Sequence, residues 1–212
     1  MTSIDLIRLG KTLAQAGMIH GSGGNLSCRI EDYIIITASG ANLGRLQEAD
    51  LVVLALDGSP LEISPSQRSS EWALHVGAYQ MRPKAQVVIH AHPPKAITLG
   101  ILGHSLPALT PDQYLHLGSH VPLIRYITPT TESLAVAVAN VLETRPAVLL
   151  QNHGVVVTAE GIEHAQLRLT LLEEACNIYL GALAVGKPRV LSEENQQALD
   201  NVTGGRYKMK EA

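Results

Sequence analysis

Three histidines are the residues of this chain best suited to chemistry. His90 and His92 close the apolar run Val87–Ile89, and His153 closes a second apolar run, Val148–Leu150. Side chains two positions apart on a strand share a face, so the first two imidazoles should project together where their strand ends. Histidine is costly to bury without a partner, and imidazole is a common zinc ligand. A single histidine at such a place is more often a hydrogen-bonded structural residue, but three at two strand ends favour a metal site.

The elements that must position these histidines can be predicted from capping residues and apolar spacing. Helices are predicted over 3–18, 69–81, from 94, over 132–144 and over 161–185. Strands are predicted over 26–30, 33–38, 51–56, 86–91, 121–127, 147–151 and 155–158. Strands occur both as hairpin-like pairs and between helices, which favours an α/β fold with a mixed sheet covered on both faces. The longest helix, over 161–185, is apolar on more than one side, which favours burial against the sheet and a neighbouring element or subunit.

Composition narrows the class of protein. The chain has 212 residues, enough for one domain with a sizeable core, and its net charge is −3 from 16 basic and 19 acidic residues. We find no long basic run for nucleic acid, no signal-peptide pattern, and no apolar segment of the roughly 20 residues that span a bilayer. Cys28 and Cys176 lie far apart and read as free thiols of a reducing compartment, so a cytoplasmic protein is expected.

Five short motifs in order resemble the class II aldolase/adducin family. They are Gly24-Asn25, Ser39-Gly40, Ser69-Ser70-Glu71-Trp72, His90-Ala91-His92 and Asn152-His153-Gly154. The similarity extends from about Leu6 to Pro188. It implies a three-layer α/β/α fold around a mostly antiparallel sheet, a single domain over 1–212 with a tail from about 190, and a homotetramer with sites between subunits.

The resemblance also assigns metal ligands and a base. His90, His92 and His153 would bind one Zn²⁺ per subunit, and Mn²⁺, Co²⁺ or Fe²⁺ would also suit three imidazoles. Glu71 would be a further ligand at rest and the base in catalysis, although by itself it reads as a first-turn carboxylate favoured by the helix dipole. Three neutral ligands leave an open position at which a 2-keto sugar phosphate could chelate and pass through a metal-stabilised enediolate.

Small residues would hold the substrate's phosphate. The positions that match the family's phosphate loops are Gly24, Asn25, Ser39, Gly40, Ser69 and Ser70. Ser69 and Ser70 precede a helix, where free N–H groups and the dipole attract anions. Each residue alone would be an ordinary turn or cap, so the joint match carries the prediction.

Two tyrosines are candidates for the catalytic acid, which the family aldolases take from a neighbouring subunit. Pro111 occupies the first family position, so Tyr114 could serve after a small shift or be a surface residue. Tyr207 matches the second position, near the C-terminus. The sequence leaves the choice between them open. His75, four residues after Glu71 on the same helix face, could orient that carboxylate.

The resemblance therefore implies a class II, zinc-dependent aldehyde-lyase. It would cleave a ketose 1-phosphate, similar to L-fuculose 1-phosphate, to dihydroxyacetone phosphate and an aldehyde. A sugar-acid phosphate decarboxylase, a sugar-phosphate dehydratase and a 4-epimerase of the same superfamily remain alternatives, and the run Leu109-Thr110-Pro111 resembles the decarboxylases. A non-enzymatic, adducin-like structural module is disfavoured because the three histidines and Glu71 are all present.

Overall fold

A computed structural model describes residues 2–61 and 63–205, which form a central sheet between two layers of helices. The strands of the main sheet are β1 (Asn25–Ile30), β2 (Tyr33–Thr37), β3 (Leu51–Ala55), β4 (Val87–Ala91), β7 (Leu123–Ile124), β8 (Ala147–Leu150) and β9 (Gly154–Ala159). Their order is β3-β2-β1-β4-β9-β8-β7. Only β7 and β8 pair in parallel among these described strands, so the sheet is mixed and mostly antiparallel, as predicted.

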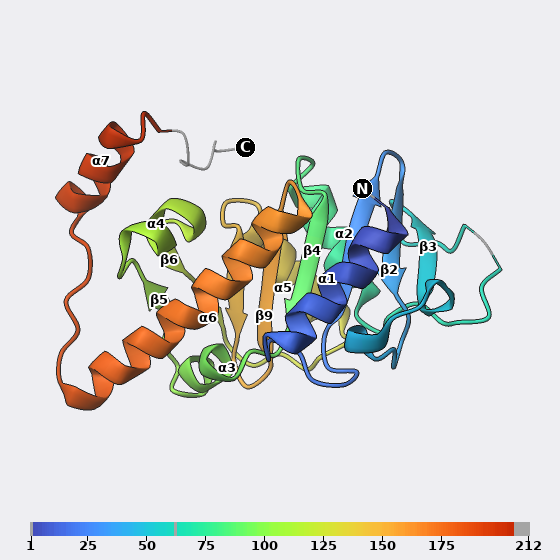
Figure 1. The fold of residues 1–212 in the computed structure, drawn as a ribbon, viewed down its shortest axis with the longest axis horizontal. Helices are drawn as coiled ribbons and strands as arrows, with labels where there is room; N and C mark the ends of the chain where they lie inside the picture. The colour runs from blue at the N-terminus through green and yellow to red at the C-terminus, as the bar shows by residue number, and fades with distance from the viewer. Residues whose placement is uncertain (1, 62, 206–212) are drawn as a thin grey trace.

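The helices cover both faces of this sheet. They are α1 (Ser3–Gln15), α2 (Trp72–Met81), α3 (Pro94–Ile101), α4 (Pro111–Leu117), α5 (Glu132–Leu142), α6 (Ile162–Val185) and α7 (Glu193–Val202), with 3-10 turns at Leu43–Arg45 and Glu48–Asp50. In Figure 1, α1 and α6 cross the front of the sheet, and α2 and α5 lie behind it. The three-layer α/β/α fold is confirmed.

Strand alternation builds a separate core on each face. In β4, Val87 and Ile89 join the cluster that packs under α1, α3 and α6, whereas Val88 joins the cluster under α2 and α5. His90 continues this alternation and so lies on the α2 side of the sheet. Every residue of β4 is buried, which places the strand that carries the first histidine at the centre of the fold.

Strand register brings three strand ends to one place. Asn25, which begins β1, lies opposite His90 near the end of β4. On the other side of β4, Ala91 lies opposite Val155 near the start of β9. Because these pairs are antiparallel, the start of β1, the end of β4 and the start of β9 meet at the same edge of the sheet.

Some boundaries differ from the predicted ones. The strand expected over 121–127 is split at Pro122 into β6 (His120–Val121) and β7. The first piece pairs with β5 (Leu106–Pro107) in a separate small sheet, and the second joins the main sheet. The first helix ends at Gln15 rather than 18, because Gly17 has φ of +70° and leaves the helical conformation. The predicted tail contains α7, which begins at a Ser192 cap.

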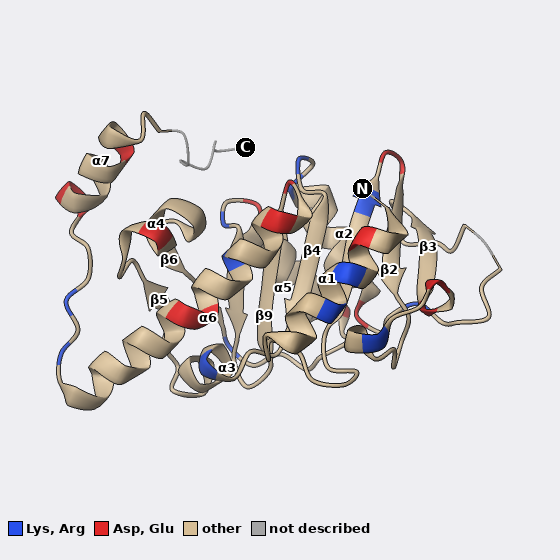
Figure 2. Cartoon of the chain, in the orientation of Figure 1, with Lys and Arg blue, Asp and Glu red and all other residues tan. Residues whose placement is uncertain are grey.

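Charge is dispersed over the surface helices. Figure 2 shows acidic and basic residues along both α1 and α6, so neither of these helices carries one sign of charge alone. Within the described parts of the chain, we find no helix with the length and apolar character required to cross a membrane.

Candidate active site

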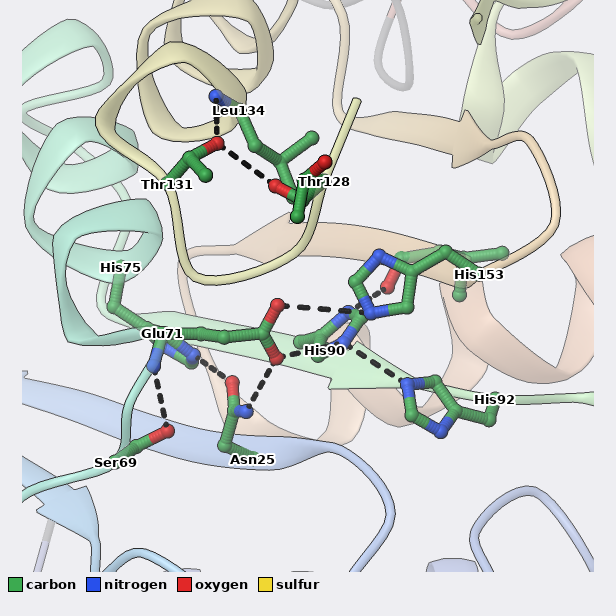
Figure 3. Close-up of polar contacts among 11 residues, drawn as sticks. Asn25, Ser69, Glu71, His75, His90, His92, Thr128, Thr131, Leu134 and His153 are labelled. Carbon is green, nitrogen blue, oxygen red and sulfur yellow. Dashed lines mark hydrogen bonds and ion pairs between the residues drawn. The ribbon is translucent and has the colours of Figure 1, made fainter. Parts of the chain in front are cut away.

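The three histidines meet at the edge where β1, β4 and β9 come together (Figure 3). Their ligand-type atoms all lie within 4.8 Å of one another. Nε2 of His92 and Nε2 of His90 lie 3.1 Å apart. Two of the rings extend from the end of β4 and its continuation, and His153 extends from the turn between β8 and β9. The structure thus brings all three predicted metal-ligating side chains into one cluster.

Local backbone geometry explains the Asn152-His153-Gly154 motif. Asn152 has φ of +58°, a left-handed conformation that asparagine adopts more readily than most residues. A Cβ atom on Gly154 would overlap the backbone oxygen of Ala91 and would lie 2.7 Å from Cδ2 of His92. Glycine therefore lets β9 approach β4 closely, directly beside the histidine cluster.

A backbone contact fixes the orientation of His90, whose side chain is fully buried. Its Nδ1–H donates to the carbonyl oxygen of Val155 at 2.9 Å. Nδ1 therefore carries a proton, and Nε2 faces the cluster. Such second contacts set the tautomer of metal-binding histidines.

Glu71 brings a carboxylate to the same cluster. Its Oε2 lies 3.2 Å from Nε2 of His90, and its Oε1 lies 3.6 Å from Nε2 of His153. Asn25 Nδ2 donates to Oε2 at 3.1 Å. Burial by itself would raise the pKa of the Glu71 carboxyl, but hydrogen bonds and charge from His90, with smaller effects of Asn25 and His153, lower it to about 2. The site therefore holds an ionised carboxylate against three imidazoles.

The start of α2 differs slightly from the prediction. The helix begins at Trp72, so Glu71 is its N-cap residue rather than part of its first turn. Ser69 Oγ accepts a hydrogen bond from the Glu71 backbone N–H at 3.2 Å. The serine thus holds the backbone of the residue that presents the carboxylate.

The imidazoles of His92 and His153 are neutral near pH 7. Burial, followed by the charge of His90, lowers the pKa of His92 and that of His153 to about 4. A neutral imidazole has the lone pair that a metal ion requires.

The donor set fits a divalent metal ion. Among the described residues, Glu71 Oε1 is a buried carboxylate oxygen without a hydrogen-bond partner, and it faces the histidine cluster. An unsatisfied buried anionic oxygen is costly unless a cation is supplied. Three imidazole nitrogens and a carboxylate oxygen are ligands typical of Zn²⁺ sites. His90, His92, His153 and Glu71 could hold such an ion.

The predicted phosphate-binding segments lie at neighbouring loops. Ser39 N donates to the carbonyl oxygen of Gln67 at 2.9 Å, which joins the loop of Ser39-Gly40 to the loop that leads to Ser69-Ser70. Gly24 has φ of +87°, and a Cβ atom there would lie 2.5 Å from the backbone oxygen of His90. Gly24 is therefore required for the close approach of its loop to β4.

The side chains of the predicted phosphate-binding segments differ in whether they already make hydrogen bonds within the protein. Asn25 is buried and its amide is engaged by Glu71 and His75, and the Ser69 hydroxyl is engaged by the Glu71 backbone. Ser70 is exposed. Any contact of Asn25 with a phosphate would therefore come from its backbone.

A pocket of about 570 Å³ adjoins the predicted phosphate loops. Its lining includes Ser69, Ser70, Ser66, Arg68 and Trp72. The guanidinium of Arg68 lies 3.8 Å above the centre of the Trp72 ring and also donates to the backbone oxygen of Gly58. This cation was not among the predicted site residues, because no motif in the sequence distinguishes it from other surface arginines.

The two tyrosine candidates have different outcomes. The Tyr114 hydroxyl donates to Asp200 Oδ1 at 3.1 Å, a contact that joins α4 to α7. Burial, followed by the hydrogen bond and charge of Asp200, raises the pKa of Tyr114. Tyr207 lies outside the described residues. The choice of catalytic acid therefore stays a prediction.

Known proteins resemble this chain over most of its length. Residues 4–180 match the family model described as the Class II Aldolase and Adducin N-terminal domain. L-fuculose phosphate aldolase of Escherichia coli strain K12 is 34% identical over 183 residues, which cover 86% of this chain and 84% of that protein. The 3-oxo-tetronate 4-phosphate decarboxylase of Cupriavidus necator is 33% identical over 181 residues, which cover 83% of this chain and 82% of that protein.

A solved structure extends the likeness to the fold. An L-fuculose 1-phosphate aldolase superposes with a TM-score of 0.89 at 33% identity, over 96% of this chain and 98% of the other. The family match over residues 4–180 includes every strand of the central sheet and the histidine cluster. The chain therefore belongs to the class II aldolase and adducin family.

Proposed function

We propose that the protein is a divalent-metal-dependent aldolase. It would cleave a ketose 1-phosphate, similar to L-fuculose 1-phosphate, to dihydroxyacetone phosphate and an aldehyde. The observation that carries this proposal is the Glu71 carboxylate, which lies against His90 and His153 in a cluster of three imidazoles at a sheet edge. The relative and the solved structure described as fuculose phosphate aldolases support the same reaction class.

The proposed roles follow from the contacts. A divalent ion, proposed to be Zn²⁺ with Mn²⁺, Co²⁺ or Fe²⁺ as alternatives, would supply a Lewis acid for the substrate's carbonyl and adjacent hydroxyl oxygens. Glu71 would move the proton on the carbon next to the carbonyl, a role for which its position beside His90 and His153 suits it. Tyr207 or Tyr114 of a neighbouring subunit would exchange a proton with the aldehyde oxygen.

The phosphate would be held by backbone amides and hydroxyls. Ser39-Gly40 and Ser69-Ser70 are joined through the Ser39–Gln67 hydrogen bond, so these two loops can act on one anion. Gly24 and the backbone of Asn25 would complete the cradle. Ser70 is the exposed hydroxyl of the set and is the side chain we expect to contact the phosphate directly.

We also propose that the enzyme is a cytoplasmic homotetramer with sites between subunits. Apolar residues on α6 remain exposed in the single chain: Leu167 is 40% exposed, Ile178 is 44% exposed and Val185 is 89% exposed. Their burial against a neighbouring subunit would remove this apolar surface from water.

A decarboxylase acting on a sugar-acid phosphate is the second candidate. Pro111 is the first residue of α4. By the resemblance to the family, it stands where the aldolases would carry a tyrosine. The relative described as a 3-oxo-tetronate 4-phosphate decarboxylase matches at an identity similar to that of the aldolase. Both reactions would use the same histidine cluster and the same carboxylate.

A substrate panel tests the proposal. Purified metal-loaded protein is incubated with ketose 1-phosphates and with sugar-acid phosphates, and dihydroxyacetone phosphate, CO₂ and epimerised substrate are measured separately. We expect dihydroxyacetone phosphate from a ketose 1-phosphate, and its loss in the Glu71→Gln variant. Release of CO₂ alone would favour the decarboxylase, and no reaction with any substrate of either class would contradict both functions.

A further inference from the structure

Five polar side chains form a continuous hydrogen-bonded series between α2 and β1, which we call the polar ladder. It consists of Glu71, Asn25, His75, Ser27 and Tyr79, in spatial order. Beyond the Asn25–Glu71 contact, His75 Nε2 lies 2.5 Å from Asn25 Oδ1, and His75 Nδ1 lies 2.6 Å from Ser27 Oγ. Ser27 Oγ lies 2.8 Å from the Tyr79 hydroxyl. Figure 3 shows the end of the ladder that reaches the histidine cluster.

Matching repeats of helix and strand explain the ladder. Glu71, His75 and Tyr79 are spaced by four residues, which advances about 6 Å along a helix. Asn25 and Ser27 are spaced by two residues on the α2 side of β1, which advances about 6.7 Å along a strand. The two series therefore interleave, with each strand residue between two helix residues.

The ladder is buried, so its hydrogen bonds must be mutually consistent. His75 and Ser27 are 0% exposed, Tyr79 is 2% exposed and Asn25 is 6% exposed. In such a setting each donor needs an acceptor, and two acceptors placed against each other would be strongly destabilising.

The Asn25 amide fixes the direction of every bond. Its Nδ2 donates to Glu71 Oε2, and its Oδ1, which can only accept, faces Nε2 of His75. Nε2 of His75 must consequently carry a proton, which leaves Nδ1 to accept from the Ser27 hydroxyl. With that hydroxyl proton used, the contact of Ser27 with Tyr79 requires the tyrosine to donate. All donors of the ladder thus point toward Glu71.

We propose that His75, with its proton on Nε2 and with Nδ1 held by Ser27, is a positioning residue that keeps the Asn25 amide oriented to hold the Glu71 carboxylate at the histidine cluster. The inference rests on the base role proposed for Glu71 and adds residues that do not touch the substrate. The opposite tautomer would require Asn25 to turn its amide, which would place Oδ1 against Oε2 of Glu71.

The surroundings of His75 keep its ring neutral. Burial, followed by the charge of His90, lowers the pKa of His75 to about 3. Its two ring nitrogens are both engaged by neutral groups, Asn25 and Ser27. The ring therefore holds the orientation of the Asn25 amide and does not donate a proton to the substrate.

Two substitutions of His75 separate positioning from packing. Glutamine can place its amide nitrogen near the position of Nε2 and so still donate to Asn25, whereas asparagine places its amide nitrogen near the position of Nδ1 and loses that donor. In metal-loaded enzyme, His75→Asn should lower kcat and the rate of substrate α-proton exchange by about 10–100-fold, the usual effect of losing an outer contact to a metal-site residue. KM and bound metal should change by less than about twofold if only the carboxylate's orientation is altered.

The His75→Gln variant is the matched control and should retain most of the activity. Equal activity of the two variants would overturn the positioning role. The role would also be overturned if both variants lost activity equally and in parallel with a loss of bound metal or a lower thermal unfolding midpoint. Packing alone would then explain the lower activity.

A spectroscopic measurement tests the ladder independently of catalysis. In zinc-loaded wild-type protein labelled with ¹⁵N-histidine, the His75 signals, identified by their loss in His75→Gln, should show a protonated Nε2 and an unprotonated Nδ1. A protonated Nδ1 would overturn the inference. If the wild type cleaves no sugar phosphate but shows the expected tautomer, the proposed function fails while the ladder stands.

Discussion

Acid should destabilise this protein in a way that can be traced to one buried ring. His75 is fully buried with a pKa of about 3, against 6.5 for an exposed histidine. Between pH 6.5 and pH 3, His75 therefore binds a proton in the unfolded chain but not in the folded chain. The contribution of His75 to the free energy of unfolding is complete above that pH and decreases as the pH falls toward 3.

The size of the effect follows from the two pKa values. One pKa unit corresponds to about 1.4 kcal/mol, so His75 should reduce the free energy of unfolding by about 2 kcal/mol between pH 7.5 and pH 5. The His75→Gln variant lacks this proton and should lack this loss. Other titrating groups, including the predicted metal ligands, are present in both proteins and cancel in the difference.

Urea unfolding of both proteins at a series of pH values measures this difference. Protein concentration must be the same throughout, since the stability of an oligomer depends on it. We expect a constant difference above about pH 7 and a change of about 2 kcal/mol in favour of the variant by pH 5. Parallel curves over the whole range would refute a neutral buried His75, and with it the direction of the polar ladder.

Four further changes test the site more directly. His92→Ala should abolish bound metal and activity together, measured by elemental analysis and turnover; full metal occupancy would contradict the ligand assignment. Glu71→Gln should keep the metal but slow substrate α-proton exchange by on the order of 10²–10⁴, the usual contribution of a positioned base; an unchanged exchange rate would exclude that role. Gly154→Ala should lower the free energy of unfolding by about 1–3 kcal/mol through overpacking, whereas Gly100→Ala, whose added Cβ would be 3.5 Å from its nearest neighbours, should be tolerated in the same denaturation assay. Tyr207→Phe should lower turnover while metal binding persists, and full activity would show that its hydroxyl is dispensable.

The metal-ligating cluster could be predicted because its signal is local. Apolar runs that end in histidine identify two strand ends, and period-two spacing places His90 and His92 on one face. The antiparallel order that makes these ends coincide is a property of the whole sheet, and the resemblance to a family supplied it. Without the resemblance, the spacing of the histidines favours a metal site only slightly over three structural histidines.

The role of Asn25 could not be predicted in the same way. Its loop matches a phosphate-binding segment, but its side chain turns toward Glu71 because its strand position faces α2. The spacing of Glu71, His75 and Tyr79 was visible in the sequence as a helix face. Its meaning depends on which strand that helix covers, and this is decided by packing across the fold.

Two other features depended on tertiary context. Pro122 separates β6, in the small sheet, from β7, in the main sheet. The apolar pattern of 121–127 does not indicate this division. The helix α7 is polar on average, and its buried Asp200 accepts a hydrogen bond from Tyr114, 86 positions earlier in the chain. The periodic spacing of residues in the sequence does not predict contacts of such long range.

The position of the histidine cluster on β4 has a consequence for local unfolding. β4 has hydrogen-bonded strands on both sides and no exposed residue, so its amide hydrogens should be among the slowest to exchange with solvent. The loop of Ser39-Gly40 follows β2, which β1 separates from β4 in the sheet. We therefore expect substitutions in this proposed phosphate loop to change which phosphorylated substrate is accepted while β4 keeps its neighbours. A family with this arrangement can acquire new substrates at its loops without rebuilding its reactive centre.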